Sequence, residues 1–186
     1  MSSPEQVIVD AGTIRRMVRR IALAIVEQVQ GTERLALVGI RRGGVPLVDR
    51  LAREIEAAEG KRVPTGTVDI TLYRDDAATA LPDPKIGPSE VPFEVGGKDV
   101  VLVDDVLMTG RTVRAAIDCL LDYGRPRRVW LAVLLDRGGR ELPVAADFIG
   151  RTLEVPEGSR VEVLFGEGDD DRAVVVLPEE LLEEGT

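Results

Sequence analysis

The residues with the clearest chemistry lie between positions 100 and 112. Two acids, Asp104 and Asp105, follow a short apolar run and precede a loop that contains Thr109 and Gly110. Backbone N–H groups in such a loop, and at the start of the helix after it, favour an anion such as phosphate. Carboxylates repel phosphate but suit sugar hydroxyls, or Mg²⁺ held through water. The stretch therefore predicts a site for a sugar 5-phosphate, with its ring against the acids. The phosphate would contact Val106, Leu107, Met108, Thr109, Gly110, Arg111 and Thr112.

A plainer interpretation of the same stretch is a solvated strand end followed by an ordinary turn. That interpretation would explain a lone Asp-Asp pair, but it explains the complete strand, acidic tip, loop and helix start less well. The loop is neither a P-loop nor a dinucleotide-binding Gly-x-Gly-x-x-Gly motif.

A second loop follows the apolar run at 35–40. Its two arginines suit a highly charged anion such as pyrophosphate, and its glycines allow the backbone to approach a ligand closely. The alternative is an ordinary tight turn between a strand and a helix. We predict a pyrophosphate-binding loop formed by Ile40, Arg41, Arg42, Gly43 and Gly44.

Both loops lie between a predicted strand and a predicted helix. The runs at 35–40, 100–103 and 129–135 are apolar without alternation, which is typical of strands buried on both faces of a parallel sheet. Apolar residues recur at helical spacing after each loop, with Thr112 as a predicted N-cap. Ligands of open α/β sheets bind at the carboxyl ends of the strands. The sequence therefore predicts an α/β fold whose central, mostly parallel sheet brings the two loops together.

Further elements are predicted on either side of this core. A helix should begin at a Thr13 cap and end at Gly31. One side of this helix carries Arg15, Arg16, Arg19 and Arg20, which form either a solvated face or a contact surface for a phosphate backbone. Additional strands are predicted at 7–9, 67–73, 161–164 and 173–177.

A long segment follows the strand predicted at 67–73. It opens with Tyr73, Arg74, Asp75 and Asp76, and residues 77–92 contain five prolines or glycines without apolar periodicity. Such loops in compact domains are usually functional or disordered. We interpret the segment as a mobile lid over the site, and the alternative is a tolerated surface insertion.

Composition restricts the class of protein. The 186 residues are 44% hydrophobic, which is enough for one domain spanning 1–186. The chain has no histidine and one cysteine, Cys119, so it has no histidine triad, cysteine metal site or internal disulfide. No apolar run is long enough for a membrane span and no signal peptide is recognisable, so we expect a cytoplasmic protein. The net charge is −9, and much of it lies in the acidic end at 166–186.

The stretch at 100–112 resembles the phosphoribosyl-pyrophosphate (PRPP) signature of type I phosphoribosyltransferases. Three further stretches are similar to the bacterial pyrimidine operon attenuation proteins, a family that also has uracil phosphoribosyltransferase activity. They are Val-Gly-Ile-Arg-Arg-Gly-Gly-Val-Pro-Leu at 38–47, Asp-Ile-Thr-Leu-Tyr-Arg-Asp-Asp at 69–76 and Leu-Ala-Val-Leu-Leu-Asp-Arg-Gly-Gly-Arg-Glu-Leu-Pro at 131–143. The similarity extends over nearly the whole chain to about residue 151.

The resemblance implies a fold, a reaction and roles for particular residues. The fold would be the type I phosphoribosyltransferase fold, with a flexible loop at about 74–92 and a small hood built from the N-terminal and 137–165 segments. The reaction would transfer phosphoribose from PRPP to uracil, giving UMP and pyrophosphate with Mg²⁺ present. Asp104 and Asp105 would hold the ribose and Mg²⁺ indirectly, Arg41 would act on pyrophosphate, and Asp136 and Arg137 would lie near the base.

The resemblance also implies UMP- or UTP-dependent binding to a messenger RNA leader, no membrane partner, and dimers or larger homo-oligomers. The basic RNA-binding face would include the four arginines of the first helix together with Arg140 and Arg151. The chain departs from the family at Gly43, where the loop usually reads Thr-Arg-Gly, at Gly139, at Ala145 and at 153–156. Several of these positions belong to the family's RNA-binding face.

Three other functions remain compatible with the sequence. The protein could be a nucleotide-sensing RNA binder with little catalysis, a phosphoribosyltransferase for a purine or orotate, or a scaffold with a vestigial site. Turnover with a panel of bases distinguishes among them.

Overall fold

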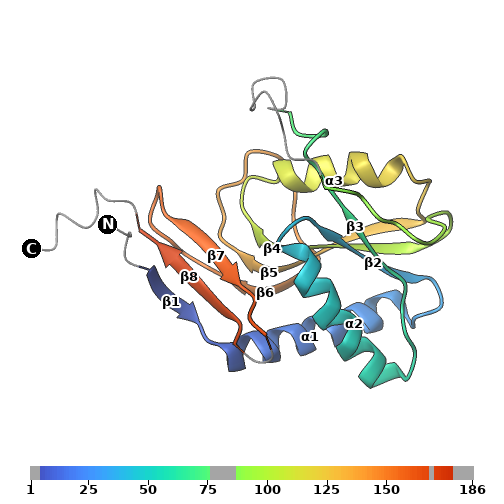
Figure 1. Ribbon diagram of the computed structural model, residues 1–186, viewed down its shortest axis with the longest axis horizontal. Coiled ribbons are helices and arrows are strands. Elements are labelled where there is room, and N and C mark those ends of the chain that lie inside the picture. Colours follow the sequence, from blue (N-terminus) through green and yellow to red (C-terminus); the bar gives the residue numbers. More distant parts are fainter. Residues whose placement is uncertain (1–4, 76–86, 168–169, 178–186) are drawn as a thin grey trace, which may run out of the picture.

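Strands and helices alternate through most of the chain (Figure 1). The computed structural model describes residues 5–75, 87–167 and 170–177. The helices are α1 Ala11–Val29, α2 Gly44–Glu59 and α3 Arg111–Leu121. The strands are β1 Glu5–Val9, β2 Leu35–Ile40, β3 Thr65–Val68, β4 Asp99–Leu107, β5 Arg128–Asp136, β6 Phe148–Thr152, β7 Arg160–Leu164 and β8 Arg172–Val176.

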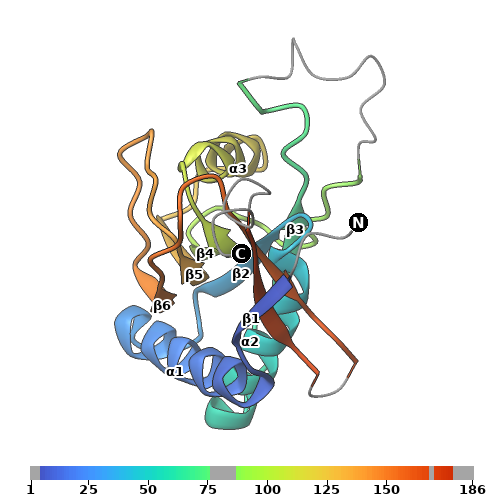
Figure 2. The ribbon, with the colours of Figure 1, turned by 90° about the vertical axis from the view of Figure 1, so that its left-hand side faces the viewer.

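A parallel sheet of order β3-β2-β4-β5-β6 forms the centre of the molecule. Successive residues of its strands face opposite layers: Val101 and Val103 pack with α1 and α2, whereas Val100 and Leu102 pack with α3. Figure 2 shows α3 on one side of the sheet and the other two helices on the opposite side. Since both faces are covered, the middle strands have continuous apolar runs, such as Val100 to Val103 of β4. The predicted α/β fold is confirmed.

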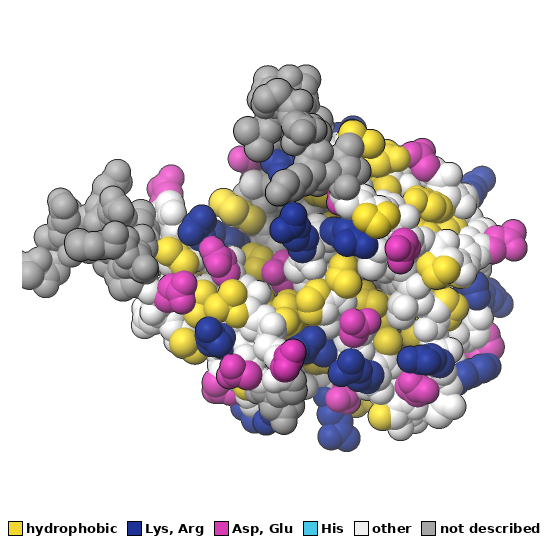
Figure 3. All heavy atoms as spheres, viewed as in Figure 1, with side chains coloured by type: hydrophobic (Ala, Val, Ile, Leu, Met, Phe, Trp, Pro, Cys, Tyr) yellow, Lys and Arg dark blue, Asp and Glu magenta, His cyan; other side chains and the backbone are white. Residues whose placement is uncertain are grey.

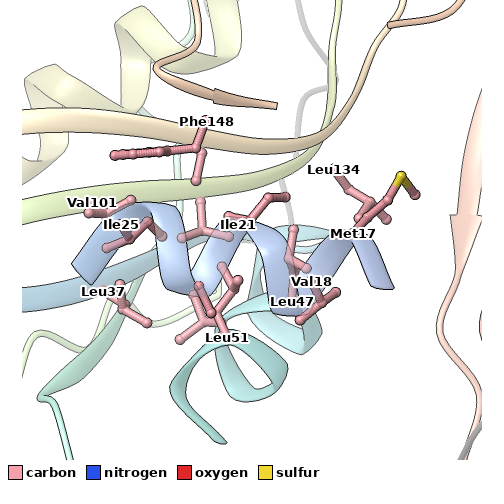
Figure 4. Packing of buried hydrophobic residues seen from close by; sticks show 14 of the residues in the cluster. Met17, Val18, Ile21, Ile25, Leu37, Leu47, Leu51, Val101, Leu134 and Phe148 are labelled. Atoms are coloured by element: carbon pink, nitrogen blue, oxygen red, sulfur yellow. The ribbon is translucent and has the colours of Figure 1, made fainter. Parts of the chain in front are cut away.

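The apolar stripe of α1 is buried against the sheet and α2. Met17, Val18, Ile21 and Ile25 point away from solvent and are at most 4% exposed. Fully burying a side chain of this size stabilises the fold by about 1.5–3 kcal/mol. These residues pack near Leu37, Leu47, Leu51, Val101, Leu134 and Phe148 (Figure 4).

A smaller antiparallel sheet of order β1-β8-β7 lies beside the large one, at the left of Figure 1. Its strands come from the two ends of the described chain, and Val7 on β1 is opposite Val174 on β8. Arg50 of α2 connects this sheet to the core, because its guanidinium forms two 2.6 Å hydrogen bonds with the carboxylate of Asp171. No helix in the described ranges is both long enough and apolar enough to cross a membrane.

Several predicted boundaries were wrong. The strand predicted at 67–73 ends at Val68, because the Asp69 side chain accepts the Thr71 N–H at 2.9 Å and turns the chain. The strand predicted at 100–103 continues to Leu107, so Asp104 and Asp105 belong to β4 itself.

The two predicted helix caps were also wrong. Asp10 caps α1 by accepting the Thr13 N–H at 2.8 Å, and Gly110 stands at the N-cap of α3 in place of Thr112. Aspartate is as good an N-cap as threonine or better, and glycine can adopt the left-handed conformation found at 110.

Candidate active site

The two predicted ligand loops lie side by side at the carboxyl ends of β2 and β4. These strands are adjacent in the sheet, yet β2 leads into α2 on one face and β4 leads into α3 on the other. Because the two connections run to opposite faces of the sheet, they leave a crevice between them at the carboxyl ends of the strands. Open α/β proteins bind ligands at this place. The sheet order therefore brings together residues that are more than sixty positions apart in the sequence.

The two acids of β4 have different environments. Asp104 is 7% exposed and accepts the Asp105 N–H at 2.9 Å. Burial, followed by the charge of Asp105, raises the pKa of Asp104 well above its ordinary value of 3.8. Asp105 is more exposed and accepts the Val106 N–H at 2.8 Å. One acid therefore tends to remain protonated, while the other faces the crevice as a hydroxyl or cation acceptor.

The loop after β4 is held in shape by the segment at 141–142. The Thr109 carbonyl accepts N–H groups from Glu141 at 2.9 Å and Leu142 at 3.0 Å, and the Thr109 hydroxyl accepts the Arg111 N–H at 3.2 Å. Gly110 has a φ of 88° and leads directly into α3. The first turn of any helix leaves amide N–H groups without intrahelical partners. These groups and the positive end of the helix suit a phosphate.

The predicted pyrophosphate loop, residues 40–44, packs directly against β4. The Arg41 N–H donates to Val68 O at 2.9 Å, and the peptide bond between Arg41 and Arg42 is cis. A Cβ added to Gly44 would lie 2.0 Å from Val103 O, and one added to Gly43 would lie 2.2 Å from Cγ of Asp105. Gly43, which departs from the family pattern, is therefore what lets the Asp105 carboxylate rest against this loop.

Arg111 connects the phosphate loop to the start of the predicted flexible loop. Its Nε donates to Glu141 at 2.6 Å, and its guanidinium also pairs with Asp75. Tyr73 donates its hydroxyl to Asp122, and this bond raises the Tyr73 pKa. Arg74 lies on the same turn, whereas Asp76 and most of the loop predicted over 77–92 fall outside the described residues.

The predicted base region is a network of internal bonds. Asp136 accepts the Gly138 N–H at 3.0 Å and Nη2 of Arg140 at 2.6 Å. Burial alone would raise the Asp136 pKa, but these bonds outweigh it and hold the pKa below its ordinary value. Arg140 also donates to Val144 O at 2.8 Å and to Met108 O at 2.7 Å. Three hydrogen bonds therefore hold the Arg140 guanidinium against the loop after β4.

Arg137 reaches in a different direction, toward the small sheet. Its Nη1 donates to Ser159 O at 2.5 Å. A cavity of about 500 Å³ lies between the small sheet and the crevice, lined by Arg42, Gly43, Pro46, Asp105, Val106 and the β7 residues from Val161 to Leu164, with Phe165. The hood strand β7 thus faces the pyrophosphate loop across a space open to a ligand.

The four arginines predicted on the first helix are exposed along α1. Arg16, Arg19 and Arg20 line one shallow groove with Leu23, Ala24 and Glu27. Arg20 also donates to the carbonyls of Ile149 and Gly150 on β6, the strand that carries Arg151. The structure therefore places α1 and β6 next to each other, so their arginines can form one face.

Sequence reasoning missed three groups that shape the site. Glu141 holds Arg111, Asp69 connects the end of β3 to the segment that begins at Gly87, and Arg50 with Asp171 connects the small sheet to α2. Asp69 and Glu141 lie inside the stretches that resemble the family, which is a signal that could have found them. The pairing of Arg50 with Asp171 has no local signal, because 121 positions separate the two residues.

Comparison with known proteins identifies relatives over nearly the whole chain. Residues 7–165 match the family model of the phosphoribosyl transferase domain. The bifunctional protein PyrR of Pelotomaculum thermopropionicum is 51% identical over 177 residues, which is 95% of this chain and 98% of that protein. The PyrR of Thermus thermophilus is 52% identical over 167 residues, which is 90% of this chain and 92% of that protein.

Solved structures show the same fold at low sequence identity. The hypoxanthine phosphoribosyltransferase of Trypanosoma cruzi, in complex with the product IMP, aligns with a TM-score of 0.69 at 20% identity. The alignment covers 99% of this chain and 96% of that one. Together with the close relatives, these matches show that the chain belongs to the phosphoribosyltransferase domain family, in the group of the bifunctional PyrR proteins.

Proposed function

We propose that this protein transfers the phosphoribosyl group of PRPP to uracil, giving UMP and pyrophosphate. The observation that carries the proposal is the contact of Gly43 with Asp105, which brings the pyrophosphate loop against the acids of β4. A substrate with a phosphate at one end and a pyrophosphate at the other fits between the α3 N-terminus and that loop. Membership in the family and the similarity to bifunctional PyrR proteins support the same reaction.

In this mechanism the residues mainly position the reactants and neutralise charge. The loop ending at Gly110 holds the 5-phosphate, and Asp105 accepts ribose hydroxyls. As the bond from C1 to the pyrophosphate oxygen breaks, Arg41 neutralises the leaving group and positive charge develops on the ribose. N1 of uracil then bonds to C1, and its proton passes to the departing pyrophosphate or to water. Removing a strong electrostatic contact of this type typically costs roughly 10²–10³-fold in rate.

The acids fit a Mg²⁺ ion that arrives with the substrate. Within the described ranges, no group of three or more acids or cysteines is arranged to hold a metal by itself. Mg²⁺ commonly binds one or two carboxylates together with substrate phosphates and water. Asp105, with Asp104 behind it, would hold the ion through water, and the ion would supply positive charge to the pyrophosphate.

The decisive experiment is UMP formation from uracil and PRPP with Mg²⁺, with hypoxanthine, guanine and orotate as alternative acceptors. We expect turnover with uracil alone. Equal or better turnover with another base would replace the substrate assignment. Binding of PRPP or UMP without turnover on any base would favour a nucleotide-sensing regulator.

We also propose that UMP or UTP controls binding of an RNA leader to the face formed by α1 and β6. Its support is the row of exposed arginines on α1 and the bonds of Arg20 to β6, which bring Arg151 to the same side. Guanidinium groups are effective phosphate ligands. The measurement is RNA affinity with and without UMP over a series of salt concentrations, and no effect of UMP would contradict the proposed control.

A further inference from the structure

Asp69 directly follows β3 and contacts the segment that begins at Gly87. Its Oδ1 accepts the N–H and the hydroxyl of Thr71, at 2.9 and 2.5 Å. Its Oδ2 accepts the Gly87 N–H at 2.8 Å, and its own N–H donates to Ser89 Oγ at 2.8 Å. One side chain therefore joins the outgoing strand end to the returning segment 18 positions later.

The same cluster contacts Arg41 of the pyrophosphate loop. The Arg41 N–H donates to Val68 O at 2.9 Å, one residue before Asp69. Gly87 lies along the Arg41 side chain, because a Cβ added to Gly87 would be 3.5 Å from Cδ and 3.6 Å from Nη1 of Arg41. Arg41 Nε is buried, and no hydrogen-bond partner for it is found in the described residues. Nε of Arg41 can therefore still donate a hydrogen bond.

The ionisation of Asp69 agrees with its position beside Arg41. Burial would raise the Asp69 pKa, but the bonds from Thr71 and Gly87 and the positive charge of Arg41 together lower it below the ordinary value. Asp69 is therefore ionised at neutral pH and attracts the Arg41 guanidinium.

We propose that Asp69 is a positioning residue that orients Arg41 for pyrophosphate, acting through its charge and through the Gly87 backbone that it holds against the arginine. The inference rests on the proposed function only for the identity of the substrate. A narrower role, in which Asp69 merely shapes the turn at Thr71, would involve neither Gly87 nor Arg41. The two roles make different predictions.

The test compares Asp69→Asn with the matched control Thr71→Val, which removes only the hydroxyl of the local turn. We expect Asp69→Asn to raise KM for PRPP by about tenfold, the typical effect of losing a charge-assisted contact, with KM for uracil nearly unchanged. Calorimetry with Mg²⁺ and pyrophosphate should show a similar loss of affinity without requiring turnover. Thr71→Val should leave both quantities near wild type.

Gly87→Ala approaches the same contact from the other side without changing charge. Its Cβ would lie 2.8 Å from Asp69 Oδ2, so the carboxylate must shift, whereas the Arg41 atoms at 3.5 and 3.6 Å would be in ordinary contact with it. We expect weaker pyrophosphate binding with little change in thermal unfolding. The inference is overturned if Asp69→Asn and Gly87→Ala bind pyrophosphate as the wild type does, or if Thr71→Val matches Asp69→Asn. If wild-type protein binds pyrophosphate but forms no UMP, the proposed function fails while the role of Asp69 can still be measured.

Discussion

Individual polar residues of the site gain their chemical character from what surrounds them. Asp104 and Asp105 are adjacent in sequence, yet β4 turns one into the interior and the other toward the crevice. Burying an ionised carboxylate is costly, so the pKa of the inner acid rises. The Asp105 carboxylate occupies its position because residue 43 is a glycine, since a Cβ there would overlap it.

For Asp104→Asn we expect a more stable but less active protein. The folded chain holds the Asp104 proton to a higher pH than the unfolded chain does, so this acid makes stability fall as pH rises above its ordinary pKa of 3.8. Asparagine has no titrating proton, so the variant does not lose this stability as the pH rises. Thermal unfolding at neutral pH should shift upward by about 2–4 °C for each kcal/mol regained, while turnover falls roughly 10²–10³-fold. An unchanged melting temperature at both pH 4 and pH 7 would contradict the assigned protonation.

For Gly43→Ala we expect weaker binding of PRPP and no other change in the kinetics. The new Cβ would overlap the Asp105 carboxyl group, which must rotate and abandon the Val106 N–H. We predict a rise of about tenfold in KM for PRPP, the effect of losing roughly one good hydrogen bond. The matched control is Gly96→Ala, where the nearest atom would be 3.8 Å away. Wild-type kinetics for both variants would show that Asp105 needs no room at position 43.

The candidate active site is built by repeating one arrangement, in which a buried strand leads through a short loop into a helix. β2 with α2 and β4 with α3 are two such units on opposite faces of one sheet, and the crevice lies where they diverge. The small sheet covers this crevice from the side, and α2 holds it through Arg50. That arginine also donates to Pro46 O at 3.0 Å and lies 4.8 Å over the ring of Phe165, so it connects the first turn of α2 to the residue that follows β7.

For Arg50→Ala we expect the small sheet to lose its attachment. Asp171 has only 5% of its side chain exposed and would become a buried charge without its partner. Breaking a buried pair in this way typically destabilises a protein by roughly 3–5 kcal/mol. Urea unfolding measures the loss, and the double variant Arg50→Ala with Asp171→Ala should recover part of it. Arg114→Ala, which removes an exposed pair with Asp118, should cost no more than about 0.5 kcal/mol.

At the scale of the whole molecule, charge is distributed unevenly although the net charge is −9. On the face seen in Figure 3, basic and acidic side chains surround a central group of hydrophobic ones. The four arginines of α1 are concentrated on its exposed side, opposite the buried stripe. A local basic face can bind RNA even when the molecule as a whole is acidic.

For Arg15→Glu with Arg19→Glu we expect weaker RNA binding and unchanged UMP formation. Each lost phosphate contact on a single strand should reduce the slope of log affinity against log salt by about 0.7. The double variant should therefore lower the slope by about 1 to 2. Arg62→Glu with Arg125→Glu makes the same charge change at other exposed sites. Equal RNA affinity for both double variants would argue against a site on α1.

Much of the architecture could be predicted because burial and helical periodicity are local properties of the sequence. The runs at 35–40 and 129–135 are apolar at every position, and such runs have few alternatives to a strand covered on both faces. The arginines and glycines that follow the run at 35–40, and the acids, glycine and threonines that follow the run at 100–103, also indicate which ligands those strand ends could bind. The strand at 67–73 was extended too far since its alternation resembled a strand, whereas the Asp69 side chain competes for the Thr71 N–H.

The sequence by itself therefore determined the α/β class and the positions of the two loops between strand and helix, and it predicts the kind of anion that each would bind. Only the tertiary structure decided which distant groups meet: Gly43 with Asp105, Arg50 with Asp171, Asp69 with Gly87, and Arg140 with Met108. The reason is physical. Strand order and the packing of one sheet on another choose these pairs, and neither leaves a periodic trace in the residues themselves.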